Sequence, residues 1–165
     1  MNWRLTDFLL IVFDVDGTLT TTKSGAKFRQ NAADWQWLPG RKELIQALLA
    51  AGVRVAIASN QGGVAFGYMP KEEVRDELHK MAKEAGIPKG GVYICFTHPN
   101  ATIPHLRQQD HRRKPGPGML QEAMLDFEAM EDQTLYVGDL PEDEAAAKAA
   151  GVSFLWADAL DEVGL

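Results

Sequence analysis

Residues 9–18 read LLIVFDVDGT and place Asp14 and Asp16 directly after a run of large apolar side chains. Such a run predicts a strand of a parallel sheet, and Gly17 permits a tight turn where the strand ends. Ligands of open parallel sheets bind beyond the carboxyl ends of the strands. The two aspartates are therefore the first candidate functional residues.

The same pattern repeats along the chain, with short apolar runs alternating with segments of helical period. This alternation predicts an α/β fold, a Rossmann-like doubly wound parallel sheet of about five strands, formed by residues 1–165 as a single domain. The predicted strands are 9–13, 53–58, 92–96, 135–137 and 153–156. The predicted helices are 41–51, 70–85, 117–130 and 142–150.

Composition sets broad limits on the class of protein. Hydrophobic residues make up 45% of the chain and charged residues 24%, as in ordinary globular proteins. No apolar segment is long enough to span a bilayer, and the run 8–13 lacks the features of a signal peptide. Cys95 is the only cysteine, which excludes an intrachain disulfide. We expect a soluble cytoplasmic protein, either a monomer or a small homo-oligomer.

Polar residues also follow two other predicted strands. Ser59, Asn60 and Gln61 follow the second strand, and Asp139 follows the fourth. Each fragment alone is more often a turn or a helix cap. Found in order after successive strands, they indicate one site at the carboxyl edge of the sheet.

The residue types at this edge suit phosphoryl transfer. Asp14 can attack phosphorus to give an aspartyl-phosphate, while Asp16 protonates the leaving oxygen and later activates water. Crowded carboxylates repel one another, and a hard dication compensates for this repulsion. Asp14 and Asp139 offer oxygen ligands for Mg²⁺, and Asp143 can support them from one helical turn further on.

Hydrolysis of phosphate monoesters demands strong stabilisation of negative charge. Lys114 is the candidate for this role, with help from Arg113. The hydroxyl of Ser59 and the backbone amides of Asn60 and Gln61 are expected to hold the remaining phosphoryl oxygens.

These residues resemble the motifs of the haloacid dehalogenase superfamily. Residues 14–20 are similar to its first motif, Ser59-Asn60 to its second, Lys114 to its third and Gly138-Asp139 to its fourth. The resemblance implies a phosphatase with an aspartyl-phosphate intermediate and Mg²⁺ bound by Asp14, Asp139 and the backbone carbonyl of Asp16. No large cap insertion is evident.

The segments 59–63 and 113–119 resemble a capless subclass of that superfamily, which includes polynucleotide 3'-phosphatases and the histidinol-phosphate and heptose bisphosphate phosphatases. Residues 21–25, Phe28 and Asp34-Trp35 resemble the polynucleotide enzymes, so the favoured substrate is a polynucleotide 3'-phosphate. The second half of the chain resembles heptose bisphosphate phosphatase, which leaves a small phosphorylated metabolite as the alternative.

Two loops carry clustered positive charge. Lys23, Lys27 and Arg29 lie in the first, and we assign Lys23 to substrate binding. These cations could contact the phosphates of a nucleic-acid 3' end, while Trp35 or Trp37 could stack on a base. Such tryptophans also often pack against the core, which is the alternative interpretation.

The heptose bisphosphate phosphatases usually carry a zinc loop, with Cys-x-His followed by Cys-x-Cys. In this chain Cys95 is present, but Thr97, Asp110 and Arg112 replace the other ligands, so we expect no structural zinc. A substitute site formed by His98, His105 and His111 stays open as an alternative.

An alternative of another class is a noncatalytic domain in which the aspartyl-phosphate is a stable signal. An acid/base at Asp16 argues against it, because such a group speeds the loss of the phosphoryl group.

Overall fold

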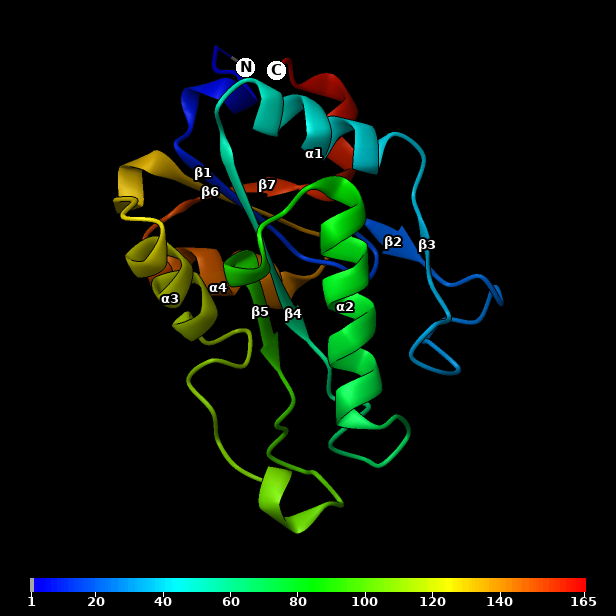
Figure 1. Cartoon of the computed structure of the whole chain (residues 1–165). Helices are drawn as coiled ribbons and strands as arrows, with labels where there is room; N and C mark the ends of the chain where they lie inside the picture. The colour runs from blue at the N-terminus through cyan, green and yellow to red at the C-terminus, as the bar shows by residue number, and fades with distance from the viewer. Residues whose placement is uncertain (1) are drawn as a thin grey trace.

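The computed structural model describes residues 2–165 and contains a five-stranded parallel sheet (Figure 1). Its strand order is β5-β4-β1-β6-β7. The strands are β1 (Leu10–Phe13), β4 (Arg54–Asn60), β5 (Val92–Cys95), β6 (Thr134–Gly138) and β7 (Ser153–Trp156). This arrangement confirms the predicted fold class. Across the same residues, no helix is both long and apolar enough to cross a membrane.

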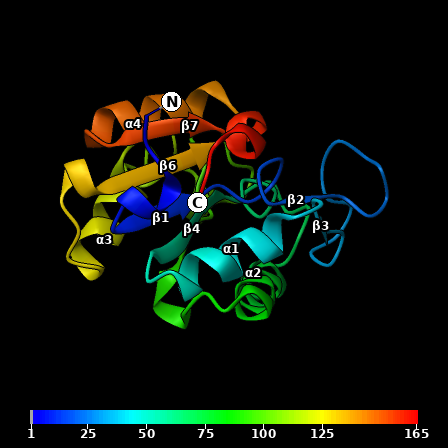
Figure 2. The ribbon, with the colours of Figure 1, turned by 90° about the horizontal axis from the view of Figure 1, so that it is seen from above.

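The helices cover both faces of the sheet (Figure 2). They are α1 (Arg41–Ala50), α2 (Lys71–Ala85), α3 (Gly118–Asp126) and α4 (Pro141–Ala150). Helices α1 and α2 pack on one face of the sheet, while α3 and α4 pack on the other.

Alternate residues of each strand enter different cores, because successive side chains point to opposite faces of a sheet. In β1, Ile11 and Phe13 enter the core beneath α1 and α2, while Leu10 and Val12 enter the core beneath α3 and α4. All four side chains are fully buried. Burial on both faces explains the unbroken apolar run in the sequence.

Helix α3 is shorter than the sequence predicts. It ends at Asp126 rather than Met130, and Glu128 adopts a left-handed conformation with a φ of 52°. The amide of Ala129 then bonds the carbonyl oxygen of Met124, which closes the helix end. The apolar residues Phe127, Ala129 and Met130 continue the helical pattern in the sequence, although the backbone has already left the helix there.

A short hairpin that the sequence does not predict lies between β1 and α1. It consists of β2 (Thr20–Thr21) and β3 (Gln36–Trp37), and residues 22–35 form its loop (Figure 1). The Asp34 carboxylate holds the loop together by accepting bonds from the amide and hydroxyl of Ser24 and from the amide of Gln30.

Trp35 and Trp37 pack the hairpin against α2. Their indole nitrogens donate to the carboxylates of Glu77 and Glu84, and the two rings meet edge to face. Trp35 is 7% exposed. The proposed stacking of a base on Trp35 is therefore wrong, and the core interpretation of this residue is correct.

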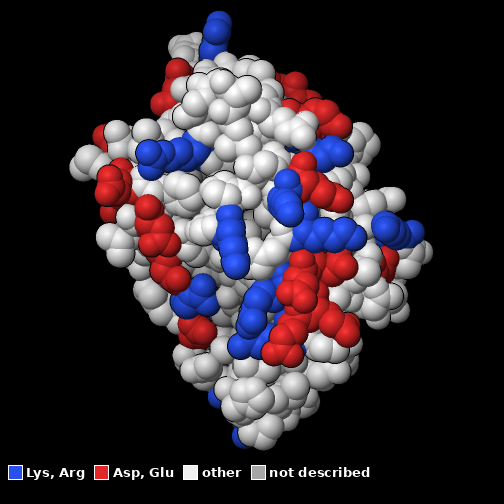
Figure 3. All heavy atoms as spheres, viewed as in Figure 1, with Lys and Arg blue, Asp and Glu red and all other residues white. Residues whose placement is uncertain are grey.

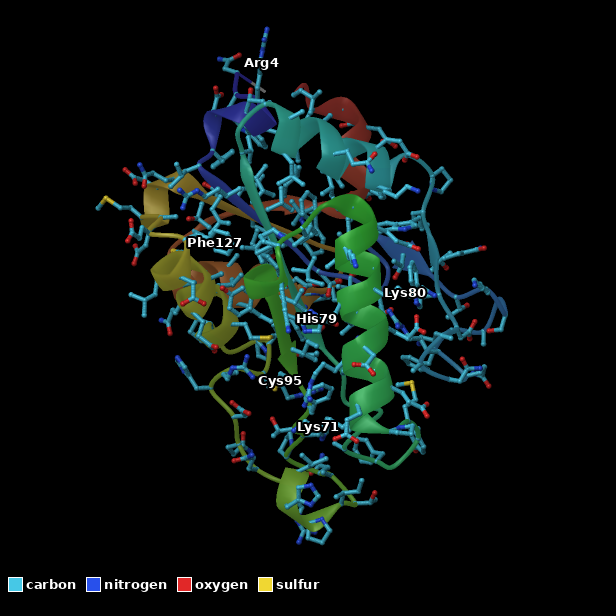
Figure 4. The ribbon with its side chains drawn as sticks, in the orientation of Figure 1. Arg4, Lys71, His79, Lys80, Cys95 and Phe127 are labelled. Carbon is cyan, nitrogen blue, oxygen red and sulfur yellow. The ribbon has the colours of Figure 1, made fainter. Side chains whose placement is uncertain are left out.

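The second long segment, residues 96–117, joins β5 to α3. Figure 4 shows Cys95 at the end of β5, where the chain enters this segment. Near its end the segment returns to the sheet, because the side-chain amide of Asn60 accepts from the amide of Lys114 and donates to its carbonyl oxygen. This pair of bonds delivers Lys114 to the carboxyl edge of the sheet.

Candidate active site

Three strand ends and one loop meet at the carboxyl edge of the sheet. Asp14 follows β1, Ser59 lies near the end of β4, and Asp139 follows β6, while the 96–117 segment supplies Lys114. The structure therefore brings together the catalytic residues that the sequence predicts, although Lys114 is one hundred positions from Asp14.

Lys114 and Asp14 form a buried ion pair. The Nζ atom of Lys114 lies 2.8 Å from Oδ1 of Asp14, and the two side chains are 5% and 9% exposed. Burial by itself lowers the pKa of Lys114, but the neighbouring carboxylates outweigh this effect and raise the pKa well above its usual value. The ammonium therefore stays charged beside Asp14. Burial raises the pKa of Asp14, and the ammonium opposes that rise.

Two further residues hold the ammonium in place. Lys114 Nζ also lies 2.8 Å from Oδ1 of Asp143 and 2.8 Å from the hydroxyl of Tyr136, which itself donates to Asp143. The sequence indicates Asp143 as a supporting residue but does not single out Tyr136. The available signal was a hydroxyl at the centre of the predicted strand 135–137, three residues before Asp139.

Asp16 stands at the wall of a cavity of about 830 Å³. Its side chain is 47% exposed, and both carboxylate oxygens are held. Arg29 Nε donates to Oδ1 at 2.9 Å, and Gln61 Nε2 donates to Oδ2 at 2.9 Å. Asp16 is thus open to a substrate while Asp14 beside it is almost closed to solvent.

At the end of β4, the backbone amide of Gln61 does not have the phosphate-binding role that the sequence predicts. The backbone amide of Gln61 donates to the carbonyl oxygen of Cys95, so it is not free to hold a phosphoryl oxygen. Gln61 acts through its side chain instead, which donates to Ser59 Oγ at 2.7 Å as well as to Asp16. The sequence could not reveal this, because the ladder between β4 and β5 uses the amide.

Of the two cations predicted to bind substrate, Arg113 lies at the cavity and Lys23 does not. Arg113 lines the cavity with Asn60 and Gln61, and its Nη1 donates to the carbonyl oxygen of Thr97. Lys23 is exposed and is not among the residues that line the cavity, so the structure does not bring it to the site. The hairpin loop instead brings Arg29 to the cavity.

The acidic residues fit a magnesium ion. One carboxylate oxygen from each of Asp14, Asp139 and Asp143 lies within 4.8 Å of the other two. Oxygen donors of this kind suit Mg²⁺, which needs one or two carboxylates plus water and phosphate oxygens. Asp14 and Asp139 are the protein's candidate ligands, because both carboxylate oxygens of Asp143 already accept hydrogen bonds, Oδ1 from Lys114 and Oδ2 from two backbone amides.

Gly17 provides the space for Asp139 at this position. Its φ is 87°, and a Cβ atom there would collide with the Asp139 carboxylate. The hydroxyl of Thr18 lies within hydrogen-bond distance of both Asp14 and Asp139. The turn after β1 is thus shaped around Asp14 and Asp139, the two carboxylates predicted to bind the metal.

The residues at the positions of the zinc ligands in the heptose bisphosphate phosphatases form a hydrogen-bonded network in this chain. Thr97 Oγ1 lies 2.7 Å from Asp110 Oδ2 and 3.1 Å from Cys95 Sγ. The three histidines do not form a substitute site, because the acidic cluster above is the only such group of possible metal ligands found within residues 2–165. His98 packs against Phe66, and His111 bonds to Gln121.

Comparison with known proteins matches residues 9–155 to the family model described as polynucleotide kinase 3 phosphatase. The chain is 35% identical over 121 residues to D-glycero-beta-D-manno-heptose-1,7-bisphosphate 7-phosphatase of Rhodopseudomonas palustris, covering 71% of this chain and 67% of that protein. It is 34% identical over 119 residues to D-glycero-alpha-D-manno-heptose-1,7-bisphosphate 7-phosphatase of Burkholderia mallei, covering 70% and 63%. The match thus spans about two thirds of each relative.

The fold is also similar to a solved structure that contains bound ligands. This is D,D-heptose 1.7-bisphosphate phosphatase from B. bronchiseptica complexed with magnesium and phosphate. The TM-score is 0.71 and the sequence identity 26%, with 88% of this chain and 78% of that chain covered.

Proposed function

We propose that this chain, which belongs to the polynucleotide kinase 3 phosphatase family, hydrolyses a small phosphorylated metabolite with Asp14 as the nucleophile. The comparisons confirm the predicted haloacid dehalogenase resemblance and the phosphatase class. The acidic triad and the magnesium in the solved relative support Mg²⁺ as the cofactor.

The observation that carries the mechanism is the 2.8 Å contact between Lys114 Nζ and Asp14 Oδ1. A carboxylate oxygen of Asp14 attacks phosphorus and forms an acyl phosphate, while the bond from phosphorus to the leaving oxygen breaks. Asp16 donates its proton to that oxygen, so a neutral alcohol departs. Lys114 compensates the negative charge that develops on the phosphoryl group.

The second half of the reaction regenerates the enzyme. Water attacks phosphorus, and Asp16, now ionised, accepts the proton of the water. The bond between phosphorus and the Asp14 oxygen breaks, which releases inorganic phosphate. The exposure of Asp16 to the cavity supports this role, because both the leaving alcohol and the incoming water must reach it.

Asp14 and Asp139 would hold magnesium, which supplies charge neutralisation for the phosphoryl oxygens when bound. The protein's own contribution there is to keep two carboxylates close enough to share an ion. Asp143 supports the arrangement by accepting bonds from the amides of Asp139 and Leu140.

Three observations favour a small metabolite over a polynucleotide end. The named relatives act on heptose-1,7-bisphosphate. Trp35 is buried against α2, and Lys23 does not line the cavity, so neither is in place to bind a nucleic-acid strand at the site. On the face shown in Figure 3, basic side chains lie among acidic ones rather than in a continuous band. The named relatives do not support a polynucleotide 3'-phosphate as the substrate, which the sequence favours.

The named relatives make heptose bisphosphate the first substrate to test. Such a substrate carries a second phosphate besides the one that is hydrolysed. Arg113 lines the cavity and is the cation that we assign to an additional anionic group.

The test is release of inorganic phosphate by the purified protein with Mg²⁺. Heptose 1,7-bisphosphate, histidinol phosphate and a 3'-phosphorylated oligonucleotide serve as substrates, and D14N serves as the blank. We expect the highest kcat/KM with heptose bisphosphate. A preference for the oligonucleotide would overturn the substrate proposal, and equal release by D14N would overturn the mechanism.

A further inference from the structure

Arg29 is a buried charge on a loop that the sequence marks as a basic surface. Its side chain is 4% exposed, although it lies in the hairpin loop between β2 and β3. A buried guanidinium needs a counter-charge, because burial removes its hydration. In the part of the chain that the structure describes, its ion-pair partner is Asp16, with Nε 2.9 Å from Oδ1.

The contact restrains the Asp16 carboxylate on one side. Gln61 Nε2 restrains it on the other, at 2.9 Å from Oδ2. Donors on both oxygens fix the plane of a carboxylate as well as its position. Arg29 itself is anchored by its own loop, since Nη1 donates to the carbonyl oxygen of Ala32 at 3.1 Å.

The arrangement leaves a hydrogen bond unmade. Nη2 of Arg29 is buried and has no partner among residues 2–165. Unsatisfied buried donors are rare in folded proteins and call for an explanation. Arg29 lines the same cavity as Asp16, so this buried donor lies beside the carboxylate that it holds.

We propose that Arg29 is the positioning residue of Asp16 and so determines how well the enzyme expels poor leaving groups. This inference rests on the proposed acid/base role of Asp16. An alkoxide leaving group needs a proton as its bond to phosphorus breaks, whereas a nitrophenolate leaves without one. Displacement of the Asp16 carboxyl should therefore slow the hydrolysis of alkyl phosphates more than that of aryl phosphates.

The test compares kcat/KM for p-nitrophenyl phosphate and for an alkyl phosphate such as glycerol phosphate. This parameter reports the steps up to departure of the leaving group. General acid catalysis is worth about 10²–10⁴-fold, so R29Q should lose about 10- to 100-fold on the alkyl phosphate. It should lose only about 3-fold or less on the aryl phosphate, where the proton is not needed.

Three controls separate this role from a structural one. R54Q removes an exposed arginine at the opposite end of β4 and should leave kcat/KM unchanged for both substrates. R29K keeps the buried charge but not the planar Nε contact, so it should fold if R29Q does not and still discriminate against the alkyl phosphate. R29Q added to D16N should cause no further loss, because Arg29 acts through Asp16.

The outcomes distinguish the two levels of the hypothesis. If D16N keeps wild-type activity on the alkyl phosphate, the proposed acid/base role is wrong. If D16N is impaired but the Arg29 variants lose equal activity on both substrates, or multiply the loss in D16N, the acid/base role stands and the positioning role of Arg29 is overturned.

Discussion

The hydroxyl of Tyr136 lies 2.8 Å from the ammonium of Lys114, in a position where both side chains are almost completely buried. Four acceptors surround this ammonium: Asp14, Asp143, Tyr136 and the carbonyl oxygen of Ala58. An ammonium has three hydrogens to donate. One acceptor can therefore be exchanged for a phosphoryl oxygen without leaving a hydrogen of Lys114 unpaired.

Tyr136→Phe tests this arrangement with little change in volume. Asp143 loses a donor, so we expect the free energy of unfolding to fall by about 1–3 kcal/mol. Because Lys114 keeps three acceptors, the protein should retain measurable phosphatase activity. Chemical denaturation and steady-state kinetics measure both effects. Complete loss of activity in a folded variant would contradict the proposed spare acceptor.

Lys114→Met should be far more damaging. It leaves the carboxylates of Asp14 and Asp143 buried without their counter-charge. Removing one partner of a buried pair typically costs about 3–5 kcal/mol, and the variant should also be inactive. Lys148→Met, an exposed lysine on α4, is the matched control and should change neither property. Equal unfolding free energies for the two variants would count against the ion pair.

Gly17→Ala separates a local collision from backbone strain. Gly17 and Gly52 have similar φ values of 87° and 90°, so alanine at either position costs roughly 1–2 kcal/mol. Only at Gly17 would the new Cβ atom collide with Asp139, since nothing lies within 4 Å at Gly52. We therefore expect Gly17→Ala, but not Gly52→Ala, to raise the Mg²⁺ concentration needed for half-maximal activity.

If both glycine variants show the same magnesium dependence in a titration of activity, Asp139 does not depend on the space that Gly17 provides. Chelation with EDTA is the companion measurement. It should abolish activity of the wild-type enzyme, and added Mg²⁺ should restore it.

Asp34 should make the hairpin loop sensitive to acid. The bond from the Ser24 hydroxyl and that from the amide of Gln30 hold the pKa of this carboxyl below its usual value. A group with a depressed pKa stabilises the fold above its unfolded pKa of about 3.9, and that contribution is lost as the pH falls through the folded value. Asp34→Asn should thus be less stable than wild type at neutral pH.

The difference in stability between wild type and Asp34→Asn should shrink in acid, because protonated Asp34 is uncharged, as asparagine is. Thermal unfolding of both proteins between neutral pH and about pH 3 measures it. A gap in melting temperature that stays constant over this range would show that the charge of Asp34 is not what stabilises the loop.

The sequence by itself determined the layered fold and most residues of the site. Strands such as β1 are buried on both faces, so their apolar runs are visible without any knowledge of their neighbours. Asp14, Ser59 and Asp139 follow from the strand ends, because parallel strands end at one edge. The hairpin β2–β3 was not visible, since strands of two residues carry no periodic pattern.

Only the tertiary structure decided what the two long segments do. Arg29 and Lys23 look equivalent in the sequence, yet Arg29 turns inward to Asp16 while Lys23 stays exposed. Tyr136 carries a hydroxyl between the apolar residues Leu135 and Val137, and the importance of that hydroxyl depends on a lysine brought in by Asn60. These roles depend on contacts between residues far apart in the chain, and local patterns carry no information about such contacts.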